Sequence, residues 1–529
     1  MILNSLKHIK TAFLLFCAGL VSSFMYGEEV GGIINSEIVD HYVEKFNKYD
    51  EELYVQYIPN TEASSFLKSN IPFFECPDTE LEEVYYFRWW TYRKNIKKTP
   101  GGFIITEFLP DVRWAGKYNG IACSGALHFY EGRWLRDKQY LDDYAHYWFN
   151  GGSPRSYSFP LADALYNYYL VTGNDEIVKT LFPDLISNFS EWEKDRYSDK
   201  EGLFWQYDVR DGMEHSIGGH GFRATINSYM AADALAISKI AKMLNDTRGL
   251  DYAYRSEQIV KKMFDRLWDK DSSFLKVLPL KSDTLCSARE LHGYTPWYFN
   301  LVGEKYAKAW SFLMSSNHFY APYGPTTAEQ CHPKFRITYK SHPCLWDGPS
   351  WPLSTSITLV GLANLLNSQR QAYISQKDYL DLLKVYAHSH TLKKENGTQV
   401  RWIDENIDPY TGDWIVREIM KDKENVPREN PKERGKDYNH SSFCDLIISG
   451  LVGVRPQEDN SVVINPLLPD NTWEYFCLDR VSYKGRQLTV LYDKSGKKYN
   501  KGKGLMLYVD GKKVVSSPTL SKLNYKMKK

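Results

Sequence analysis

Residues 205–229 read WQYDVRDGMEHSIGGHGFRATINSY, a short segment that crowds Asp, Glu, Arg and His side chains between aromatic residues. The apolar spacing that follows is helical, so we expect an amphipathic helix to begin near Asn227 or Ser228. A second segment, DENIDPYTGDW at 404–414, presents two adjacent carboxylates just before a Pro-Tyr-Thr-Gly turn. Two carboxylate-bearing loops, far apart in the chain and flanked by Trp and Tyr, are what acid/base cleavage of a sugar–sugar bond requires.

Helical periodicity dominates the chain around these segments. Apolar residues keep to one face in ADALAISKIAKML (232–244) and in DYAYRSEQIVKKMFDRLWD (251–269). The pattern predicts further helices at 81–95, 138–149, 160–171, 177–196, 303–314, 354–367, 378–389 and 441–451. Long segments rich in Gly, Pro, Trp and Tyr separate them, at 197–227, 319–352 and 401–440. Loops of that length in a compact domain usually serve function, and the candidate residues lie in them.

The pattern changes after Val452. Residues 460–515 alternate apolar and polar side chains in short runs, with Asp-Lys-Ser-Gly and Asp-Gly turns between them. We therefore expect a helical domain at 28–453 and a small C-terminal β domain, a sandwich, at 454–529.

The N-terminus has the pattern of an export signal. Lys7 and Lys10 precede the apolar stretch TAFLLFCAGLVSSFMYG, and acidic residues follow it. We expect a signal peptide at 1–27 and a periplasmic or secreted protein with no stable membrane insertion after cleavage. A lipid anchor on Cys17 is less favoured, because the bulky Phe16 stands where such sites have a small residue.

Charge and aromatic content indicate which classes of ligand the protein can bind. The 529 residues carry a formal net charge of +1, so the protein has no overall electrostatic attraction to nucleic acid or to an anionic membrane. Aromatic residues make up 15% of the chain, which suits stacking on the apolar face of sugar rings. We expect a carbohydrate substrate and no nucleic acid, and the sequence leaves the oligomeric state open.

Cysteine usage is not that of a disulfide scaffold. An odd number of cysteines remains without Cys17, so at least one thiol is free. The segment CHPKFRITYKSHPC (331–344) alone offers a pair for a disulfide or, with His332 and His342, for zinc. Its spacing differs from that of true zinc sites, which favours unpaired thiols. We expect no cofactor, and nothing in the spacing demands calcium.

Three motifs resemble one group of glycosidases. Asp-Gly-Met-Glu-His-Ser (211–216) is similar to the Ser-Gly-Met-Asp-Asn-Ser segment of the trehalase, processing α-glucosidase I and mannosylglycerate hydrolase group. Trp-Asp-Gly-Pro-Ser-Trp-Pro (346–352) resembles its Trp-Arg-Gly-Pro-x-Trp motif, and residues 404–412 resemble its Tyr-Glu-x-Tyr-Asn-Pro-x-Thr-Gly segment. All three occur in the group's order. The resemblance implies a mainly α fold, an (α/α)6 toroid of the six-hairpin glycosidase type, and inverting hydrolysis of mostly α-linked glycosides.

The same resemblance implies the catalytic pair. Glu214 matches the general acid, which is an Asp in the group, and Glu405 matches the general base. The acid must stay protonated near neutrality, which burial beside Trp205 or Met213 favours because burial disfavours the charged form. Asp211 is the rival acid, three residues away.

Several residues are candidates to bind substrate. Trp114 and Trp351 are candidates for stacking on a sugar, and Arg223 and Asn227 could hold sugar hydroxyls or brace Glu214. Asp347 replaces the group's Arg, so specificity does not transfer from relatives. The other substrate-binding candidates are Arg113, Trp205, His215, His220, Trp402 and His440.

Other interpretations stay open. Asp211 and Glu214 could cap the following helix, and Glu405 could belong to a surface turn. A glycoside phosphorylase shares this architecture but replaces the base with a phosphate pocket. A polysaccharide lyase would use a Tyr or His base, for which Tyr229 and His220 are available. A non-catalytic carbohydrate-binding protein is the remaining alternative.

Overall fold

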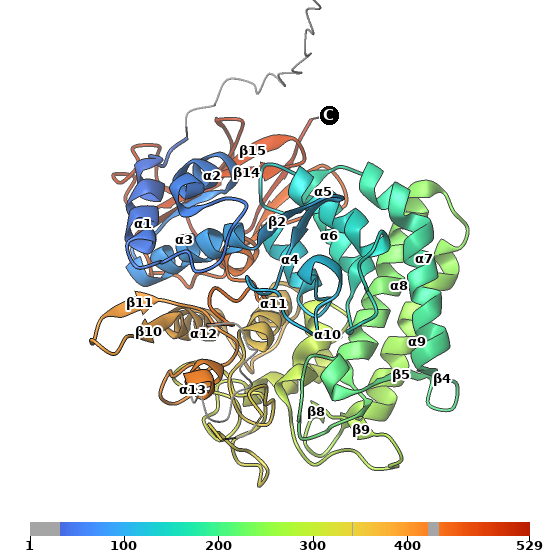
Figure 1. The fold of residues 1–529 in the computed structure, drawn as a ribbon. Coiled ribbons are helices and arrows are strands. Elements are labelled where there is room, and N and C mark those ends of the chain that lie inside the picture. Colours follow the sequence, from blue (N-terminus) through green and yellow to red (C-terminus); the bar gives the residue numbers. More distant parts are fainter. Residues whose placement is uncertain (1–31, 341, 422–432, 529) are drawn as a thin grey trace, which may run out of the picture.

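The structure is a computed structural model that describes residues 32–340, 342–421 and 433–528. The signal peptide expected at 1–27 lies outside the described residues. Helices dominate the described chain, and strands gather near the C-terminus (Figure 1). This confirms the expected fold class, an (α/α)6 toroid with a small β domain.

Six helices form an inner ring in the described part of the chain. They are α4 (Gly125–Gly132), α6 (Leu161–Thr172), α8 (Ala224–Leu244), α10 (Thr295–Tyr298), α11 (Pro352–Ser368) and the π-helix η6 (Leu446–Leu451). Each packs against the next in chain order. Glu131, near the end of α4, accepts hydrogen bonds from the backbone N–H groups of Phe443, Cys444 and Asp445 at 2.8–3.0 Å, which closes the ring.

An outer helix precedes each inner one. The outer helices are α3 (Thr79–Lys94), α5 (Gln139–Phe149), α7 (Glu176–Arg196), α9 (Gly249–Leu267), the 3-10 helix η5 (Glu304–Phe312) and α12 (Gln376–Ser389). Further helices lie outside this pattern: α1 (Glu37–Asn47), α2 (Ala63–Asn70) and α13 (Ile415–Lys421). The helix α9 keeps Tyr252, Ile259 and Met263 on its buried face, as its amphipathic pattern predicts. Among the described residues, no helix has the length and apolar character needed to cross a membrane.

The sequence prediction differs from the structure at several helices. The helix expected from Asn227 or Ser228 begins at Ala224, directly after the extended backbone of Arg223. The helix expected at 303–314 is a 3-10 helix, and most of 441–451 forms the π-helix η6. The inner helix α4 was not predicted, because all of its residues are buried and it has no polar face to reveal a period.

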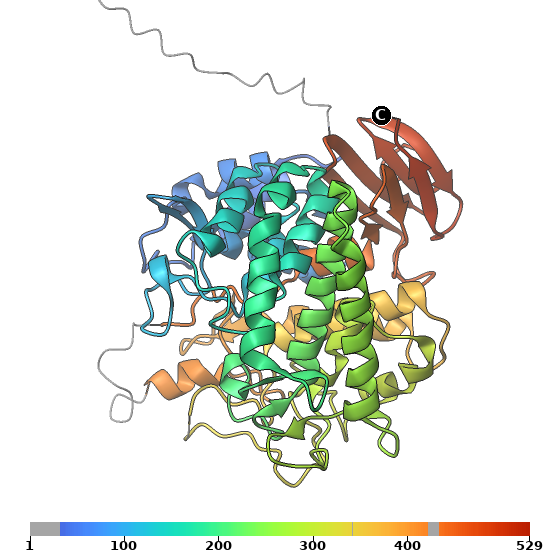
Figure 2. The ribbon, with the colours of Figure 1, turned by 90° about the vertical axis from the view of Figure 1, so that its right-hand side faces the viewer.

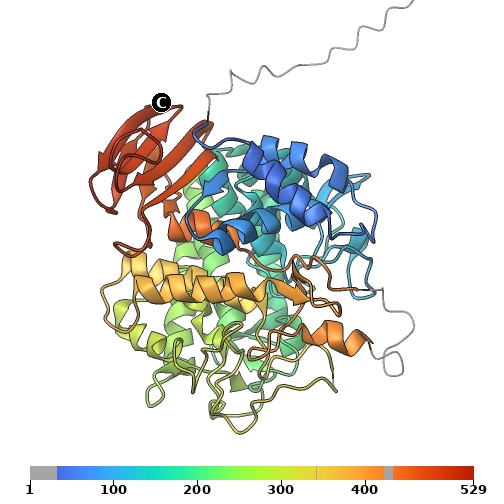
Figure 3. The ribbon, with the colours of Figure 1, turned by 90° about the vertical axis from the view of Figure 1, so that its left-hand side faces the viewer.

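Two antiparallel sheets form the C-terminal β domain. The first has the order β1-β14-β15-β16-β17 and the second the order β12-β13-β18. Their strands are β1 (Phe73–Glu75), β12 (Val454–Arg455), β13 (Ser461–Ile464), β14 (Tyr475–Tyr483), β15 (Arg486–Asp493), β16 (Gly504–Val509), β17 (Lys512–Ser517) and β18 (Leu523–Lys526). The edge strand β1 comes from the N-terminal part of the chain, and Figure 3 shows that part (blue) beside the β domain (red).

Short strands shape the loops around the barrel. A four-stranded sheet joins β4 (Tyr197–Ser198), β5 (Leu203–Gln206), β6 (Gly221–Phe222) and β9 (Leu278–Pro279). Two-stranded hairpins are β2 (Ile96–Thr99) with β3 (Gly102–Ile105), β7 (Trp268–Asp269) with β8 (Phe274–Leu275), and β10 (Thr391–Lys393) with β11 (Gln399–Arg401). Because β5 pairs with β6, the segment between them, residues 207–220, is held as a closed loop directly before α8.

Candidate active site

A cavity of about 280 Å³ lies at the end of the ring where the inner helices begin. Its walls come from segments just before α4, α6, α8 and η6 and from the first turn of α11. Glu214, Glu405, Trp114, Trp351 and His440 line it together. The other lining residues are Glu107, Phe108, Ile121, Cys123, Tyr157, Val209, Gly212, His342, Pro343, Cys344, Trp346, Leu353, Arg434 and Tyr438. The fold thus brings two segments that are distant in sequence, 207–220 and 404–414, to one cavity.

Glu214 lies in the loop between β5 and α8. Gly212 turns the chain there with a φ of +69°, and a Cβ at Gly212 would clash with the sulfur of Cys123. The carbonyl oxygen of Glu214 accepts a hydrogen bond from the N–H of Trp346 at 3.1 Å. Burial, together with the smaller effect of the nearby acids Asp208, Glu405 and Glu107, raises the pKa of the Glu214 carboxyl to about 7. A carboxyl group in this state can donate a proton near neutral pH.

Glu405 lies in a different electrostatic setting. The Nε and Nη2 atoms of Arg434 lie 2.7 and 2.5 Å from its Oε1, so the ionised carboxylate has a buried counter-ion. The Cys344 thiol lies 3.5 Å from Oε2. The N–H of Glu405 donates to the neighbouring Asp404 side chain at 2.8 Å, which fixes the backbone of the motif. A carboxylate positioned in this way can accept a proton from water.

Glu107 is a third carboxyl group in the cavity, and no sequence pattern pointed to it. It follows β3 and accepts hydrogen bonds from the hydroxyls of Tyr438 and, at 2.9 Å, Ser124. Burial raises its pKa to about 7, and the charge of Glu405 adds to the effect. Arg434 and Tyr438 were also missed; their only signal was their position close to His440 in the chain.

Aromatic rings form the remaining walls. Trp114 is 46% exposed at the rim, edge-on to Phe108 at 5.7 Å, with the Arg434 guanidinium 5.1 Å from its ring. Trp351 is buried and stacks on Trp346 with ring centroids 4.7 Å apart. An exposed indole at a cavity rim can stack on a sugar ring, whereas Trp351 shapes the floor.

His440 is buried within the same cavity wall. Among the described residues, neither of its ring nitrogens has a hydrogen-bond partner. Burial holds its pKa well below the usual range, and the charge of Arg88 adds to this effect, so the ring is neutral. A neutral imidazole with free nitrogens can exchange hydrogen bonds with a sugar hydroxyl.

Comparison with known proteins identifies the family. Residues 117–441, more than half of the chain, match the model of the mannosylglycerate hydrolase MGH1-like glycoside hydrolase domain. The chain belongs to this glycoside hydrolase family. The resemblance inferred from the three motifs is thereby confirmed. Residues 454–516 match the C-terminal domain of glycosyl hydrolase family 65.

Two solved structures agree with the fold, and a third is similar at a lower score. A structure named "Sialidase" is 39% identical over 93% of this chain, with a TM-score of 0.85, and the chain spans 44% of its length. The GH78 family rhamnosidase of Bacillus SP. GL1 is 12% identical over 83% of this chain and 41% of its own, with a TM-score of 0.50, a likeness of fold alone. The GH63 mannosylglycerate hydrolase of Thermus thermophilus matches 69% of this chain and 98% of its own, at 12% identity and a TM-score of 0.47.

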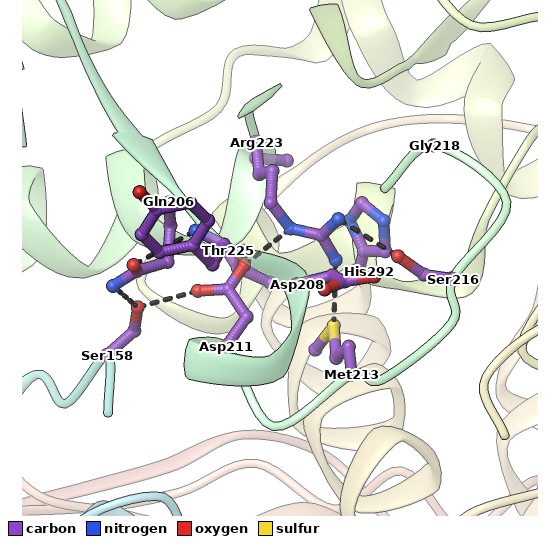
Figure 4. Close-up of polar contacts among 12 residues, drawn as sticks. Ser158, Gln206, Asp208, Asp211, Met213, Ser216, Gly218, Arg223, Thr225 and His292 are labelled. Atoms are coloured by element: carbon purple, nitrogen blue, oxygen red, sulfur yellow. Dashed lines mark hydrogen bonds and ion pairs between the residues drawn. The ribbon is translucent and has the colours of Figure 1, made fainter. Parts of the chain in front are cut away.

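The structure places Asp211 outside the cavity of this glycoside hydrolase domain. Its side chain is fully buried and forms an ion pair with Arg223 at 2.6 Å (Figure 4). Ser158 donates to its Oδ1 at 2.6 Å, and the Thr225 hydroxyl donates to Oδ2. Arg223 also donates to the Ser216 hydroxyl at 3.0 Å. Asp211 and Arg223, predicted as a rival acid and a sugar ligand, instead tie the 207–220 loop to the start of α8.

Three other predicted sugar ligands also lie away from the cavity lining. Asn227 accepts from the N–H of Phe204 and donates to its carbonyl, both at 2.8 Å, and so joins α8 to β5. Trp205 packs under the guanidinium of Arg196 at 4.5 Å. The exposed His220 contacts Asp208 at 3.0 Å.

The last four candidates do not line the cavity. His215 is exposed, and its ring lies 5.0 Å from that of the cavity residue His342, which places it near the rim. Arg113 is exposed next to Trp114. Asp347 forms an ion pair with Arg336 at 2.5 Å, so its charge is compensated within the protein. The indole of Trp402 donates to Asp404 at 3.3 Å and lines a different cavity.

The seven cysteines of the described chain are free thiols. Cys331 and Cys344 are not bridged, which agrees with the favoured interpretation of unpaired thiols. Cys331 approaches His318 and Glu329 instead, with one ligand atom from each within 4.8 Å of the others. Glu329 there is ion-paired with Arg289 at 2.7 Å, which competes with a cation for the same carboxylate.

Proposed function

We propose that this glycoside hydrolase cleaves an α-linked oligosaccharide or polysaccharide bond with inversion, using Glu214 as general acid and Glu405 as general base. One observation carries the proposal. The two carboxyl groups line the same cavity, one with a pKa raised to about 7 by burial and the other ion-paired with Arg434. A carboxyl group that holds its proton near neutrality, facing the same cavity as a carboxylate with a buried counter-ion, suits an acid and a base working together.

The roles follow from this difference. Protonated Glu214 gives its proton to the glycosidic oxygen as that bond breaks, so the leaving sugar departs as a neutral alcohol. Glu405 takes a proton from water as the water oxygen bonds to the anomeric carbon from the opposite face. In an inverting enzyme the two carboxyl groups stand about 6.5–9.5 Å apart, to leave room for that water.

The charges around the cavity favour a neutral sugar. Three carboxyl groups, Glu107, Glu214 and Glu405, line it, and its arginine, Arg434, is already paired with Glu405. Among the described lining residues, a carboxylated sugar would meet these groups with no arginine or lysine other than the paired Arg434 to balance it. We therefore propose neutral glycosides as substrates. The similar structure is named a sialidase, but this chain spans only 44% of that protein. A sialoside, which carries a carboxylate, is therefore the contrasting substrate in the test below.

Export is also proposed. Lys7 and Lys10 followed by an apolar stretch support a cleaved signal peptide and a periplasmic or secreted enzyme. Mass spectrometry of protein recovered from the native host tests this proposal. An N-terminus that begins after residue 27 supports it. An intact N-terminus, or a lipid on Cys17, contradicts it.

A screen of α-linked neutral oligosaccharides and a sialoside, followed by ¹H NMR of the first product, tests the function. We expect hydrolysis of a neutral glycoside and a product of inverted anomeric configuration. Retention excludes the two-carboxylate inversion, and release of sialic acid overturns the charge argument. Turnover that requires phosphate indicates a phosphorylase, and an unsaturated product absorbing in the ultraviolet indicates a lyase.

A further inference from the structure

A second cavity, of about 490 Å³, lies at the other end of the ring, where the inner helices end. Residues of α4, α6, α8 and α11 line it, together with residues 455–457, which lead into the β domain. Figure 2 shows the β domain (red) beside this end of the barrel. A surface groove shares Leu170, Lys239, Pro456 and Gln457 with the cavity, so a ligand can reach it from solvent.

The lining resembles that of a site for a polar ring. Tyrosine and phenylalanine rings alternate with side-chain amides and charged groups, a mixture that offers both stacking faces and directional hydrogen bonds. The aromatic residues are Tyr130, Tyr166, Tyr298, Phe299 and Tyr379, and the amides are Asn167, Asn300, Asn364 and Gln457.

Among the described residues that line this cavity, Arg455 is the cation that forms no ion pair. Its guanidinium donates to the side-chain oxygen of Asn364 and to the Ser449 carbonyl at 3.3 Å, both neutral acceptors. Within the described residues it forms no ion pair, whereas Arg133 pairs with Asp445 at 2.7 Å. Burial lowers the pKa of Arg455, and the nearby charge of Asp445 only partly offsets this effect, so the guanidinium is removed from water without full compensation. A guanidinium in this state suits a carboxylate, which it can bind through two parallel hydrogen bonds.

Tyr298 offers a second unsatisfied donor. Its side chain is 4% exposed, and in the described part of the chain its hydroxyl has no hydrogen-bond partner. The ring packs against Tyr130 with centroids 5.1 Å apart, so the hydroxyl is held in place on the cavity wall. A buried hydroxyl without a partner carries a desolvation penalty that a ligand oxygen would remove.

We propose that this second cavity binds a sugar acid, a pyranose or short oligosaccharide that carries one carboxylate. Arg455 contacts the carboxylate, and Tyr298 donates to a sugar oxygen. Asp163 lines the same wall, where it accepts hydrogen bonds from the Tyr130 hydroxyl at 2.8 Å and the Asn167 amide at 3.1 Å. Because each carboxylate oxygen can accept more than one hydrogen bond, Asp163 can also accept from a sugar hydroxyl. Asp163 and Asp445 disfavour a multiply charged phosphate in the same space, which makes a single carboxylate the better match.

Isothermal titration of the full-length protein with D-glucuronate, D-glucose and inorganic phosphate tests the proposal. We expect saturable binding of glucuronate, and at least tenfold weaker binding of glucose and phosphate. Crystals soaked in glucuronate should show the sugar beside Arg455. Water alone in that cavity, or equal binding of glucose, overturns the proposal.

Variants separate this site from the candidate active site. Arg455→Gln should weaken glucuronate binding at least tenfold and Tyr298→Phe at least threefold, with Arg486→Gln as the matched control. Arg486 pairs with Asp510 on the surface of the β domain and does not line the cavity. Trp114→Ala, at the other end of the barrel, should leave glucuronate binding intact. Loss of binding in Trp114→Ala but not in Arg455→Gln assigns glucuronate to the active-site cavity and overturns the proposal. Circular dichroism checks that each variant is folded. If Arg455→Gln does not fold, the position of glucuronate in the soaked wild-type crystal decides the question.

Discussion

The Asp211 side chain is fully buried, and both of its carboxylate oxygens have partners. These partners are Arg223, Ser158 and Thr225. Around Glu214, three residues further along, no other described side chain donates a hydrogen bond to the carboxyl group, which faces a cavity instead. The Asp211 carboxylate is stabilised by an ion pair and hydrogen bonds. The Glu214 carboxyl lacks such side-chain donors, and burial raises its pKa. The contrast indicates that Asp211 stabilises the loop and that Glu214 reacts, and mutation can separate these two effects.

The largest expected effect is on catalysis at the cavity. Glu214→Gln and Glu405→Gln should each lower kcat by roughly 10²–10⁴-fold, because each removes a proton-transfer group without changing side-chain size. Steady-state kinetics on the best neutral substrate measure this, and thermal melting should show both variants folded. Turnover within about threefold of wild type in either variant contradicts its assigned role.

Asp211→Asn should act on stability first. The change leaves the Arg223 guanidinium buried without a counter-ion, which costs about 3–5 kcal/mol of unfolding free energy. Urea denaturation measures the loss, and kcat of the remaining folded fraction should stay close to that of wild type. Asp246→Asn is the matched control, since Asp246 also pairs with an arginine but on the surface. A folded, fully stable but inactive Asp211→Asn protein would make Asp211 the acid.

These two residues also show how far the sequence alone reaches. The motifs predicted that Glu214 and Glu405 share a site, because their segments keep the order found in related glycosidases. They could not separate Asp211 from Glu214, since the turn at Gly212 that sends the two side chains to different surroundings is a matter of backbone geometry. Glu107 lies in no motif and enters the site only because the barrel closes around it.

The fold shows the same limit. Amphipathic helices such as α9 were predictable because one face meets water and leaves a period in the sequence. The inner helix α4 is buried on all sides and left no such period. The pairing of β1 with β14 joins residues about four hundred positions apart, and no local pattern encodes it.

The pH dependence should separate Glu214 from its neighbours. The acid works while protonated, so kcat/KM should fall about tenfold per pH unit as pH rises above about 7, the pKa of Glu214. Stability should move in the same direction. The folded protein keeps a proton that the unfolded chain loses near its ordinary pKa of 4.5, so stability falls as pH rises from there through about 7.

Glu214→Gln removes this one titration from the stability curve. The variant should gain stability relative to wild type at pH 8 and not at pH 4, as urea denaturation at the two pH values would show. Glu107 and Asp404 also have pKa values raised to about 7 and continue to titrate in the variant, so the dependence is reduced rather than abolished. An equal stability difference at both pH values contradicts a raised pKa at Glu214.

Trp114→Ala should weaken substrate binding by a smaller amount. The exposed indole at the rim contributes about 0.5–1.5 kcal/mol through stacking, so KM should rise about 2–10-fold with little change in kcat. Tyr254→Ala, which also removes an exposed ring but from the outer helix α9, is the control. An unchanged KM for Trp114→Ala places the sugar elsewhere in the cavity.

The smallest effect tests how finely Glu405 is positioned. The Cys344 thiol is a weak donor 3.5 Å from its Oε2, while Arg434 holds the other oxygen. Loss of a weak hydrogen bond is worth about 0.5 kcal/mol, so Cys344→Ala should lower kcat about two- to threefold. Cys123→Ala is a matched control, because Cys123 lines the same cavity without bonding to Glu405. If both alanine variants lower kcat equally, the cause is the shape of the cavity, and the contact between Cys344 and Glu405 does not orient the base.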